Sequence, residues 1–480
     1  MIRAVSLSSN RDVASEVVDF SEEVDSLKKP DTDRPCYALG TRIFETETTK
    51  RVIRAPLALN IVTGYYGYGK TIGVGGYVIC KAKSENDFYL YVNLRELKSA
   101  VSGLQIEPLS LRDVLKSIVI ALVDIKYPIH ILIRNNILDT NIPEIQERAS
   151  KITNEINSMD VPLASIIRNF LPEISEKRLY IVIDELEQVV PDLVGALTRI
   201  CDEAKQLDTA LKEHIRIYLL LQEALLVSSF PGFLEGKSPC GSSHAGQGVT
   251  SLAKLRGYTA EDYVKIINQI GIEDNDDMLK KVAKKLEKLP PRLVFSVFHG
   301  TKTVSEIEDA LNSLKGVAEE LILYPRNKKV KRSIDYFLNE LKKNLEETAN
   351  VTIIGTRDLR RDARSNVYVY ELIFRLQCPT KRRETTNEST VKLCIDFREN
   401  RRSGLEVLSD CQIRIERDEV GNLLIDGKSL GIDFRLMIAA YSDLRPHIEG
   451  LMKLHEEIRM VTLRYLSGYL RSRLLRSYCE

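Results

Sequence analysis

The chain has 480 residues, of which 44% are hydrophobic and 29% are charged, and its formal net charge is +1 at pH 7. This composition is typical of a globular protein that buries sizeable cores, and the length corresponds to roughly two to four domains. No apolar run approaches the about 18 residues that a membrane-spanning helix needs, so we expect no membrane partner.

The charge is unevenly distributed along the chain. Residues 326–480 contain 30 Lys and Arg against 23 Asp and Glu, which gives this third a net charge of +7, and the remainder carries −6. A basic region of this kind favours contact with the phosphates of nucleic acid. Solvated surface charge is the alternative interpretation.

The eight cysteines are dispersed, with no C-x-x-C pair, and residues 1–19 lack the apolar core of a signal peptide. This spacing predicts no zinc site and reduced thiols. We therefore expect a cytoplasmic protein.

In chain order, residues 1–41 are polar and charged and are expected to form an N-terminal arm. Residues 42–54 alternate enough to predict a strand or hairpin. The apolar run 58–62 predicts a buried strand, and segment 64–71 then reads Gly-Tyr-Tyr-Gly-Tyr-Gly-Lys-Thr. This segment fits the phosphate-loop pattern G-x-x-x-x-G-K-[ST] without a mismatch.

A loop of this kind binds the phosphates of a nucleoside triphosphate. Gly64, Gly67 and Gly69 allow a tight turn that points backbone N–H groups at a phosphate, beside the positive end of the next helix. Lys70 can reach the β- and γ-phosphates, and the hydroxyl of Thr71 can ligate Mg²⁺. We therefore predict binding of ATP and Mg²⁺.

The helix expected after the loop contains three glycines, Gly73, Gly75 and Gly76. Each weakens a helix by roughly 0.5–1 kcal/mol relative to Ala. Close packing of this helix on the sheet would explain them.

Two further strands are predicted at residues 88–93 and 179–183, and the second is followed by Asp184 and Glu185. A carboxylate at the end of a buried strand beside the phosphate loop can hold Mg²⁺, so we assign Asp184 to the metal. The adjacent carboxylate, Glu185, can orient and deprotonate the attacking water. The alternative is a strand that simply ends in polar residues.

Helices are expected between these strands. Residues 108–170 have helical spacing, with Ser110 and Asp113 marking a helix start, and residues 191–213 predict another helix. Residues 215–221 predict a further buried strand. Strands that alternate with helices indicate a parallel sheet covered by helices on both faces.

This combination resembles the AAA+ and related additional-strand ATPases over about residues 42–300. The archaeal initiator-like and STAND-like branch is the subgroup that it resembles most. The sequence of the glycine-rich loop is also similar to that of ATP-binding subunits of phage-exclusion defence systems. The resemblance implies a P-loop ATPase core over residues 42–257 and a helical lid over residues 258–325.

The resemblance also implies two residues that sense the γ-phosphate. A polar residue follows the next strand in this superfamily, and Gln222 or Glu223 stands there. The second sensor is an arginine at the start of a lid helix, and Arg292, after two prolines, fits. An exposed arginine at a helix end is the alternative for Arg292.

One departure from the family concerns the arginine finger that many ring-forming members carry. Residues 217–255 contain no arginine, so Arg256 is the nearest candidate and Arg199 lies further away. A self-activating ring is therefore in doubt, which leaves a monomer, an initiator-like ATPase or a switch activated by a partner. Tyrosines at positions 65, 66 and 68 either stack on a base or partner or pack locally.

Residues 326–480 are expected to form a smaller basic α+β domain. Helices continue to about residue 348, the pattern changes to strands from Val351, and a helical stretch over 434–477 closes the chain. Its strands are predicted at 351–355, 367–376, 391–397, 412–415 and 423–425. The basic clusters are 326–332, 357–364, 381–383, 398–402 and 471–476. We predict that they contact duplex DNA.

A nuclease is a third possibility for this domain. Glu371 on one strand and Asp396 at the end of another are vaguely similar to a restriction-endonuclease-like core. Such sites usually have a lysine where Arg398 stands, and a guanidinium does not readily transfer a proton. A nuclease-like fold used only for binding fits the pattern better than an active nuclease, and an unrelated α+β domain fits it as well as that binding fold does.

The sequence thus predicts an ATPase whose nucleotide state controls how a basic domain engages DNA. Lys70, Glu185, Gln222 and Arg292 are its catalytic candidates. The alternative is a slow STAND-like nucleotide switch that recruits a protein partner without binding nucleic acid. A protein partner or a homo-oligomer is also compatible with the sequence.

Overall fold

The computed structural model describes the following residues: 35–53, 57–100, 110–123, 129–156, 162–230, 233, 240, 250–272, 276–287, 289–298, 301–314, 327–346, 351–359, 367–377, 386–396, 411–418, 422–441 and 449–479. Most of the predicted N-terminal arm lies outside these residues. The predicted basic clusters 381–383 and 398–402 also lie outside them, as do residues 360–364 of the cluster 357–364.

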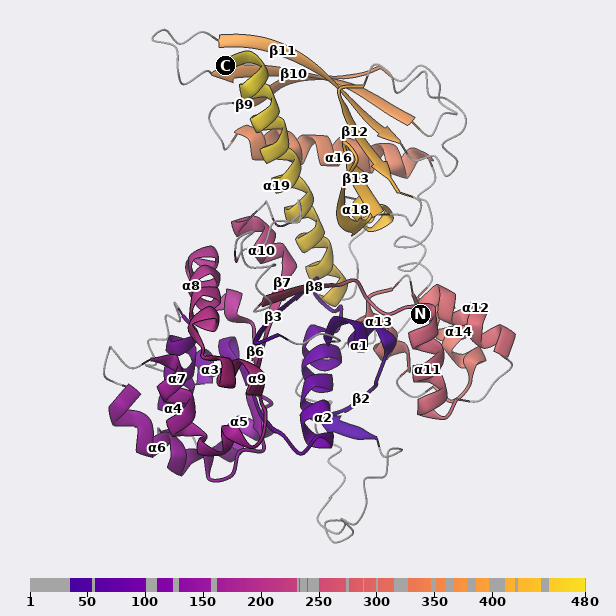
Figure 1. Ribbon diagram of the computed structural model, residues 1–480. Helices are drawn as coiled ribbons and strands as arrows, with labels where there is room; N and C mark the ends of the chain where they lie inside the picture. Colours follow the sequence, from indigo (N-terminus) through magenta and orange to yellow (C-terminus); the bar gives the residue numbers. More distant parts are fainter. Residues whose placement is uncertain are drawn as a thin grey trace. The chain divides into compact units, whose positions relative to one another are not determined.

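The fold is mixed α/β, and its first large element is a six-stranded, mostly parallel sheet (Figure 1). The strand order is β5-β4-β6-β7-β3-β8, and all neighbours are parallel except β4 and β5. The strands are β3 (Leu59–Gly64), β4 (Phe88–Asn93), β5 (Leu138–Thr140), β6 (Leu179–Asp184), β7 (Ile215–Gln222) and β8 (Thr250–Leu255). The predicted parallel sheet is therefore present, with β3 paired between β7 and β8.

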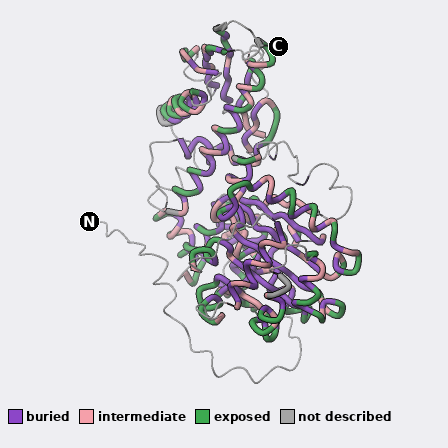
Figure 2. The backbone as a smooth tube through the Cα atoms, turned by 90° about the vertical axis from the view of Figure 1, so that its left-hand side faces the viewer, coloured by how far each residue is buried: buried purple, intermediate pink, exposed green. Residues whose placement is uncertain are grey.

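Alternate residues of each strand pack on opposite faces of this sheet. Ile61 and Leu219 belong to one hydrophobic cluster, and their neighbours Val62 and Leu220 belong to the other. Because side chains alternate with a period of two, a strand apolar at every position must be covered on both faces. Figure 2 shows the resulting contrast between the buried interior and the exposed outer segments.

Helices supply both covers. Helix α2 (Gly76–Ser84) contributes Val78 and Ile79 to the cluster of Val62. The opposite cluster includes side chains from α4 (Leu111–Val123), α7 (Leu163–Phe170) and α8 (Leu193–Gln206). The remaining helices of this region are α3 (Leu94–Ala100), α5 (Ile129–Arg134), α6 (Ile145–Ile156), α9 (Thr209–His214) and α10 (Glu223–Ser229).

Helix starts follow the predicted capping chemistry. The Ser110 hydroxyl accepts from the backbone N–H of Asp113 at 3.2 Å and precedes α4. Thr259 and Asp262 form a capping box at the start of α11 (Ala260–Ile270), as expected. The single helix predicted over 191–213 is instead the pair α8 and α9, because Asp208 caps a new helix.

The segment before the glycine-rich loop differs from the prediction. Strands β1 (Cys36–Ala38) and β2 (Thr41–Ile43) form a hairpin, but residues 47–53 form helix α1 (Glu47–Ile53) and not a strand. Thr46 caps this helix by accepting from the N–H of Thr49 at 3.1 Å. The local cap thus overrides the weak alternation of the segment.

The region of the predicted lid is helical where it is described. It contains α11, α12 (Asp276–Leu286), α13 (Pro291–Phe298) and α14 (Val304–Ser313). Aromatic rings bind these helices to the preceding chain, since Phe295 stacks on Phe44 with ring centroids 5.9 Å apart. Tyr258 meets Phe295 edge to face.

A second six-stranded sheet, β14-β13-β12-β11-β10-β9, lies in the C-terminal third (Figure 1). Its strands are β9 (Val351–Asp358), β10 (Val367–Gln377), β11 (Thr386–Asp396), β12 (Ile413–Arg417), β13 (Asn422–Ile425) and β14 (Lys428–Asp433). The helices described in this third are α16 (Asn327–Glu346), α18 (Phe434–Ala440) and α19 (Glu449–Cys479). The α+β expectation holds for the described residues, although β14 was not predicted.

Among the described residues, three cysteine pairs form disulfide bonds, which corrects the expectation of reduced thiols. The bonds join Cys36 to Cys80, Cys201 to Cys240 and Cys394 to Cys411, with Cα–Cα distances of 6.0, 5.7 and 5.8 Å. Their partners are 44, 39 and 17 residues apart, so no local spacing reveals them. Among the described helices, none combines the length and apolar character that crossing a membrane requires.

Candidate functional site

The glycine-rich loop, Gly64–Gly69, joins β3 to a π-helical turn, Lys70–Gly75, that continues into α2. Gly67 and Gly69 have φ values of +76° and +90°, a region that glycine enters without steric cost. The backbone N–H of Val74 donates to Gly69 O, five residues back, at 3.1 Å. π-helical turns often occur at functional sites.

The glycines after the loop are explained by close contacts. A Cβ on Gly75 would lie 3.1 Å from Leu220 of the sheet, as close packing on the sheet predicts. A Cβ on Gly73 would instead lie 2.2 Å from the Tyr258 hydroxyl, and one on Gly76 would lie 2.4 Å from Ile43. The latter two glycines therefore accommodate the lid region and the N-terminal hairpin.

Lys70 folds back onto its own loop. Its Nζ donates to Gly64 O at 2.8 Å and to Tyr65 O at 3.1 Å. The ammonium group thus lies over the loop, tied to neutral carbonyl acceptors. An anion bound in the loop is a stronger, charge-assisted partner for it.

Thr71 and Asp184 meet as the sequence predicts. The Thr71 hydroxyl donates to Asp184 Oδ2 at 2.5 Å, and Tyr91 Oη donates to the same oxygen at 3.3 Å. Asp184 is only 2% exposed, and its burial raises the pKa of the carboxyl group. A hydroxyl and a carboxylate held together in this way fit the protein's share of a Mg²⁺ site, because Mg²⁺ usually takes its other ligands from phosphates and water.

Glu185 follows at the end of β6 with a left-handed backbone, φ +57°. Non-glycine residues rarely adopt this region, and such strain clusters at functional sites. Burial, and then the charge of Asp184, raise the pKa of its carboxyl group. Within the described part of the chain its Oε2 has no hydrogen-bond partner, and Arg95 Nη1 lies 3.9 Å away. The carboxylate is thus available to accept a proton.

Glu187 is a site residue that the sequence reasoning missed. Its Oε1 accepts from the backbone N–H of Gln222 at 2.9 Å, which ties the end of β6 to the end of β7. Burial raises the pKa of Glu187 to about 8. The only sequence signal was a third acidic residue in Asp-Glu-Leu-Glu. This pattern does not indicate that the side chain of Glu187 is buried.

The two predicted sensor residues make different contacts at the site. Arg292 donates from its backbone N–H to Gly67 O at 3.0 Å and from Nη1 to Tyr66 Oη at 2.6 Å. Gln222 accepts from Gln188 Nε2 at 3.0 Å and donates from its own Nε2 to Glu457. Both predicted sensors therefore lie at the site, and Glu457 of α19 joins them without having been predicted.

The neighbouring Glu223 and Arg256 form a bidentate ion pair. Arg256 Nη1 and Nη2 lie 2.5 and 2.8 Å from the carboxylate oxygens of Glu223, which is fully buried. The Arg256 guanidinium also lies over the Tyr65 ring, 5.7 Å from its centroid. Arg256 is thus held within its own chain and is a poor candidate for an arginine finger, whereas Arg199 is exposed on α8.

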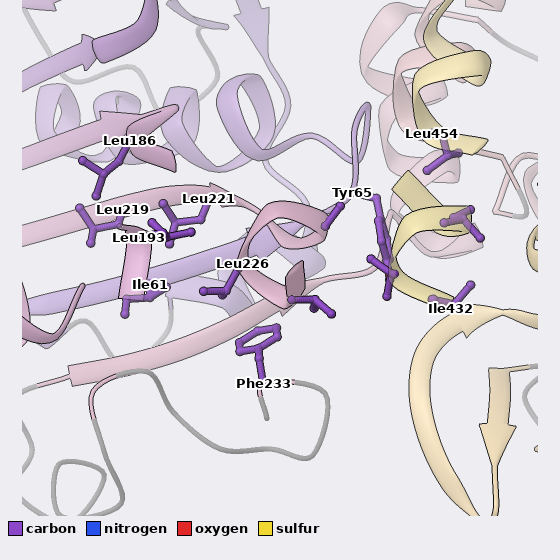
Figure 3. Packing of buried hydrophobic residues seen from close by; sticks show 14 of the residues in the cluster. Ile61, Tyr65, Leu186, Leu193, Leu219, Leu221, Leu226, Phe233, Ile432 and Leu454 are labelled. Atoms are coloured by element: carbon purple, nitrogen blue, oxygen red, sulfur yellow. The ribbon is translucent and has the colours of Figure 1, made fainter. Parts of the chain in front are cut away.

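The loop tyrosines pack within the chain. Tyr65 is 2% exposed and belongs to the hydrophobic cluster that also contains Ile432 and Leu454 of the C-terminal third (Figure 3). Tyr68 meets Tyr65 edge to face. Tyr66 receives cations on its ring, with Arg292 at 5.0 Å and Lys453 at 5.2 Å from the centroid. Local packing explains Tyr65 better than stacking on a base does.

The described residues include only part of the predicted C-terminal sites. The register pairs Val367 with Asp396, which puts Glu371 four residues, or roughly 13 Å, further along its strand. Arg473 is ion-paired with Asp426 at 2.8 Å, and clusters 381–383 and 398–402 lie outside the described residues. No group of three or more His, Cys, Asp or Glu arranged to hold a metal occurs in the described ranges.

No model of a known protein family matches the chain, and no curated protein is significantly similar to it. The function is therefore inferred from the residues that the fold brings together. These are Lys70, Thr71, Asp184 and Glu185, which meet at the carboxyl ends of β3 and β6.

Proposed function

We propose that the protein binds ATP with Mg²⁺ at the glycine-rich loop and hydrolyses it. The observation that carries this proposal is the hydrogen bond of 2.5 Å between Thr71 and Asp184, beside Lys70 and Glu185. Ligands of parallel α/β sheets bind at the carboxyl ends of the strands, which is where these side chains lie. Strand β7 lies between β3 and β6, so the polar residues that follow it, Gln222 and Glu223, come next to the same edge.

Each residue has a distinct role in the proposed reaction. The loop N–H groups and Lys70 hold the phosphates, with Lys70 exchanging its carbonyl partners for phosphate oxygens. Thr71 and Asp184 hold Mg²⁺, which when bound neutralises negative charge on the phosphates. Glu185 accepts a proton from the attacking water, and its raised pKa makes it a stronger base than an ordinary carboxylate.

We further propose that the nucleotide state controls engagement of duplex DNA by the C-terminal third. The support is its net charge of +7, since a basic surface binds phosphates in a salt-dependent way. The second candidate is a slow switch that recruits a protein partner. The pairing of Arg256 with Glu223 favours this candidate, because it removes the nearest arginine from a role between subunits.

We also propose a cytoplasmic location. The disulfides seen in the described ranges are compatible with it, since intracellular proteins of hyperthermophiles are often rich in disulfides. We therefore also propose that the organism that makes this protein grows at high temperature. Quantifying free thiols in protein taken directly from its native cells tests it.

The deciding experiment measures ATP binding and steady-state hydrolysis with and without duplex DNA. Lys70→Ala should abolish binding. Glu185→Gln should retain ATP and lower the hydrolysis rate by about 10²–10⁴-fold, the usual contribution of a general base. Lys280→Ala, an exposed change on α12, and Glu176→Gln, an exposed change outside the site, are the matched controls.

Stimulation by DNA that disappears in Glu185→Gln and weakens with salt supports a DNA-linked ATPase. A slow rate that is indifferent to DNA, with nucleotide surviving purification, favours the switch. Equal ATP affinity in Lys70→Ala and the wild type would refute the proposed site.

A further inference from the structure

Helix α19, in the last part of the chain, brings a carboxylate onto the glycine-rich loop. Glu457 is 5% exposed, and its Oε2 accepts from the backbone N–H of Tyr66 at 2.8 Å. Its Oε1 accepts from Gln222 Nε2. One side chain therefore contacts both the loop and a predicted γ-phosphate sensor, which are 391 and 235 residues away in sequence.

These contacts are of the kind that a phosphate would make. Loops of this class bind phosphate oxygens through backbone N–H groups, and a carboxylate is an anion that accepts from the same donors. Lys70 also acts on Glu457, because its charge favours the ionised carboxylate. Glu457 thus lies within the field of the cation expected to reach the β- and γ-phosphates.

Further contacts hold α19 against the loop. Two cations lie over the Tyr66 ring, Arg292 of α13 and Lys453 of α19. A Cβ on Gly450 would lie 3.6 Å from the same ring. Helix α19 also packs against α10, which follows Gln222 directly.

The same helix is joined to the C-terminal sheet region. Arg459, two residues after Glu457, donates from Nε to Glu340 of α16 at 3.2 Å and from Nη2 to the Tyr336 hydroxyl at 3.0 Å. Helix α16 in turn packs against β9. A displacement of Glu457 would therefore be passed to the elements of the basic third.

We propose that Glu457 is a built-in competitor of the terminal phosphate of ATP, which keeps α19 on the loop until ATP displaces it. This inference rests on the proposed ATP site. Two anions cannot share the Tyr66 N–H, because it has one hydrogen to donate and because two anions held this close repel each other. ADP lacks the phosphate that would reach Gln222, so it leaves the contact in place.

The energetics make such a contact reversible. Burial raises the pKa of Glu457 to about 7, so the ionised carboxylate is held in a site that disfavours its charge. Release into water removes this penalty, while the loop gains a phosphate with more charge and more acceptor oxygens. The contact is therefore strong enough to form and weak enough to be replaced.

The test compares full-length wild type with Glu457→Gln, using ATP and ADP, each with Mg²⁺. The variant keeps the size of the side chain and removes its charge. Glu456→Gln, an exposed neighbour on the same helix, is the matched control. Nucleotide affinity is measured by calorimetry, and backbone mobility of residues 451–463 by hydrogen exchange.

We expect Glu457→Gln to bind ATP about tenfold more tightly, which corresponds to the loss of one charge-assisted competing contact, and ADP less than about threefold more tightly. Wild-type α19 should exchange faster with ATP than with ADP. Glu457→Gln should exchange fast without nucleotide. Glu456→Gln should match the wild type in every measurement.

The outcomes separate the two proposals. Lys70-dependent ATP binding with no gain in Glu457→Gln and no change in α19 exchange would overturn the competitor and leave the ATP site standing. Absence of ATP binding in every variant would overturn both. Binding that appears only in Glu457→Gln would support both, with the contact acting as a complete block.

Discussion

The hydroxyl of Thr71 donates to the carboxylate of Asp184 at 2.5 Å, joining the start of the helix after the glycine-rich loop to the end of β6. The two residues are 113 positions apart, and the parallel pairing of β3 and β6 through β7 brings them together. Asp184 is almost fully buried, so the loss of a donor to it has consequences for both stability and the proposed metal binding.

Thr71→Val should therefore have two effects. It leaves a buried carboxylate with one donor fewer, which should lower the free energy of unfolding by about 1–3 kcal/mol. It should also raise the Mg²⁺ concentration needed for ATP hydrolysis. Chemical denaturation and a Mg²⁺ titration measure the two effects. Thr198→Val, on the exposed side of α8, is the control, and equal behaviour of the two variants would contradict the assignment.

Glu187→Gln should stabilise the protein increasingly as the pH rises. The pKa of Glu187 is raised to about 8 from 4.5, so the folded state binds the proton more tightly than the unfolded state. The stability that this proton provides is complete below about pH 4.5 and is lost as the pH rises to about 8, at about 1.4 kcal/mol per pH unit. The glutamine variant keeps a neutral group throughout and avoids this loss.

The measurement is chemical unfolding of both proteins from pH 5 to pH 9. The difference in unfolding free energy should grow across this range and level off above about pH 8. A constant difference would show that Glu187 does not titrate in this window. Glu213→Gln, exposed on α9, should give no trend.

Arg256→Met should lower the free energy of unfolding by about 3–5 kcal/mol, because it leaves the fully buried Glu223 without its cation. The double variant Arg256→Met/Glu223→Met should recover most of the loss, since replacing both partners of a buried pair by apolar side chains is often neutral. Denaturant titrations of the two single variants and the double variant measure the coupling. Additive losses would argue against the pair.

Gly73→Ala should disturb the start of the helix after the loop, because its Cβ would lie 2.2 Å from the Tyr258 hydroxyl oxygen. We expect a loss of about 1–3 kcal/mol, typical of overpacking. Tyr258→Phe removes that oxygen and leaves Cζ at 3.3 Å, so Gly73→Ala/Tyr258→Phe should regain most of the stability. Thermal unfolding of the wild type, the two single variants and the double variant measures this recovery. A double variant as unstable as Gly73→Ala would exclude the contact with the Tyr258 hydroxyl as the cause.

The sequence by itself determined the local parts of this protein. Continuous apolar runs at 179–183 and 215–221 predicted the buried strands, because both faces of a parallel sheet must be apolar. The glycine-rich loop and the carboxylates that follow β6 could be predicted because each motif is formed by residues that are adjacent in sequence. The prediction of a strand at residues 47–53 was wrong, because in so short a segment a helix cap outweighs weak alternation of apolar residues.

Only the tertiary structure decided which distant side chains share the site. The inward turn of Glu187, the pairing of Glu223 with Arg256, the disulfides and the arrival of Glu457 on the loop depend on contacts between residues far apart in sequence. The partners in such contacts have no fixed separation in sequence, because a connecting segment of any sufficient length allows the two residues to meet. Burial and hydrogen bonding then fix their chemistry, which is why Glu457 looks like an ordinary helix-surface glutamate until the chain is folded.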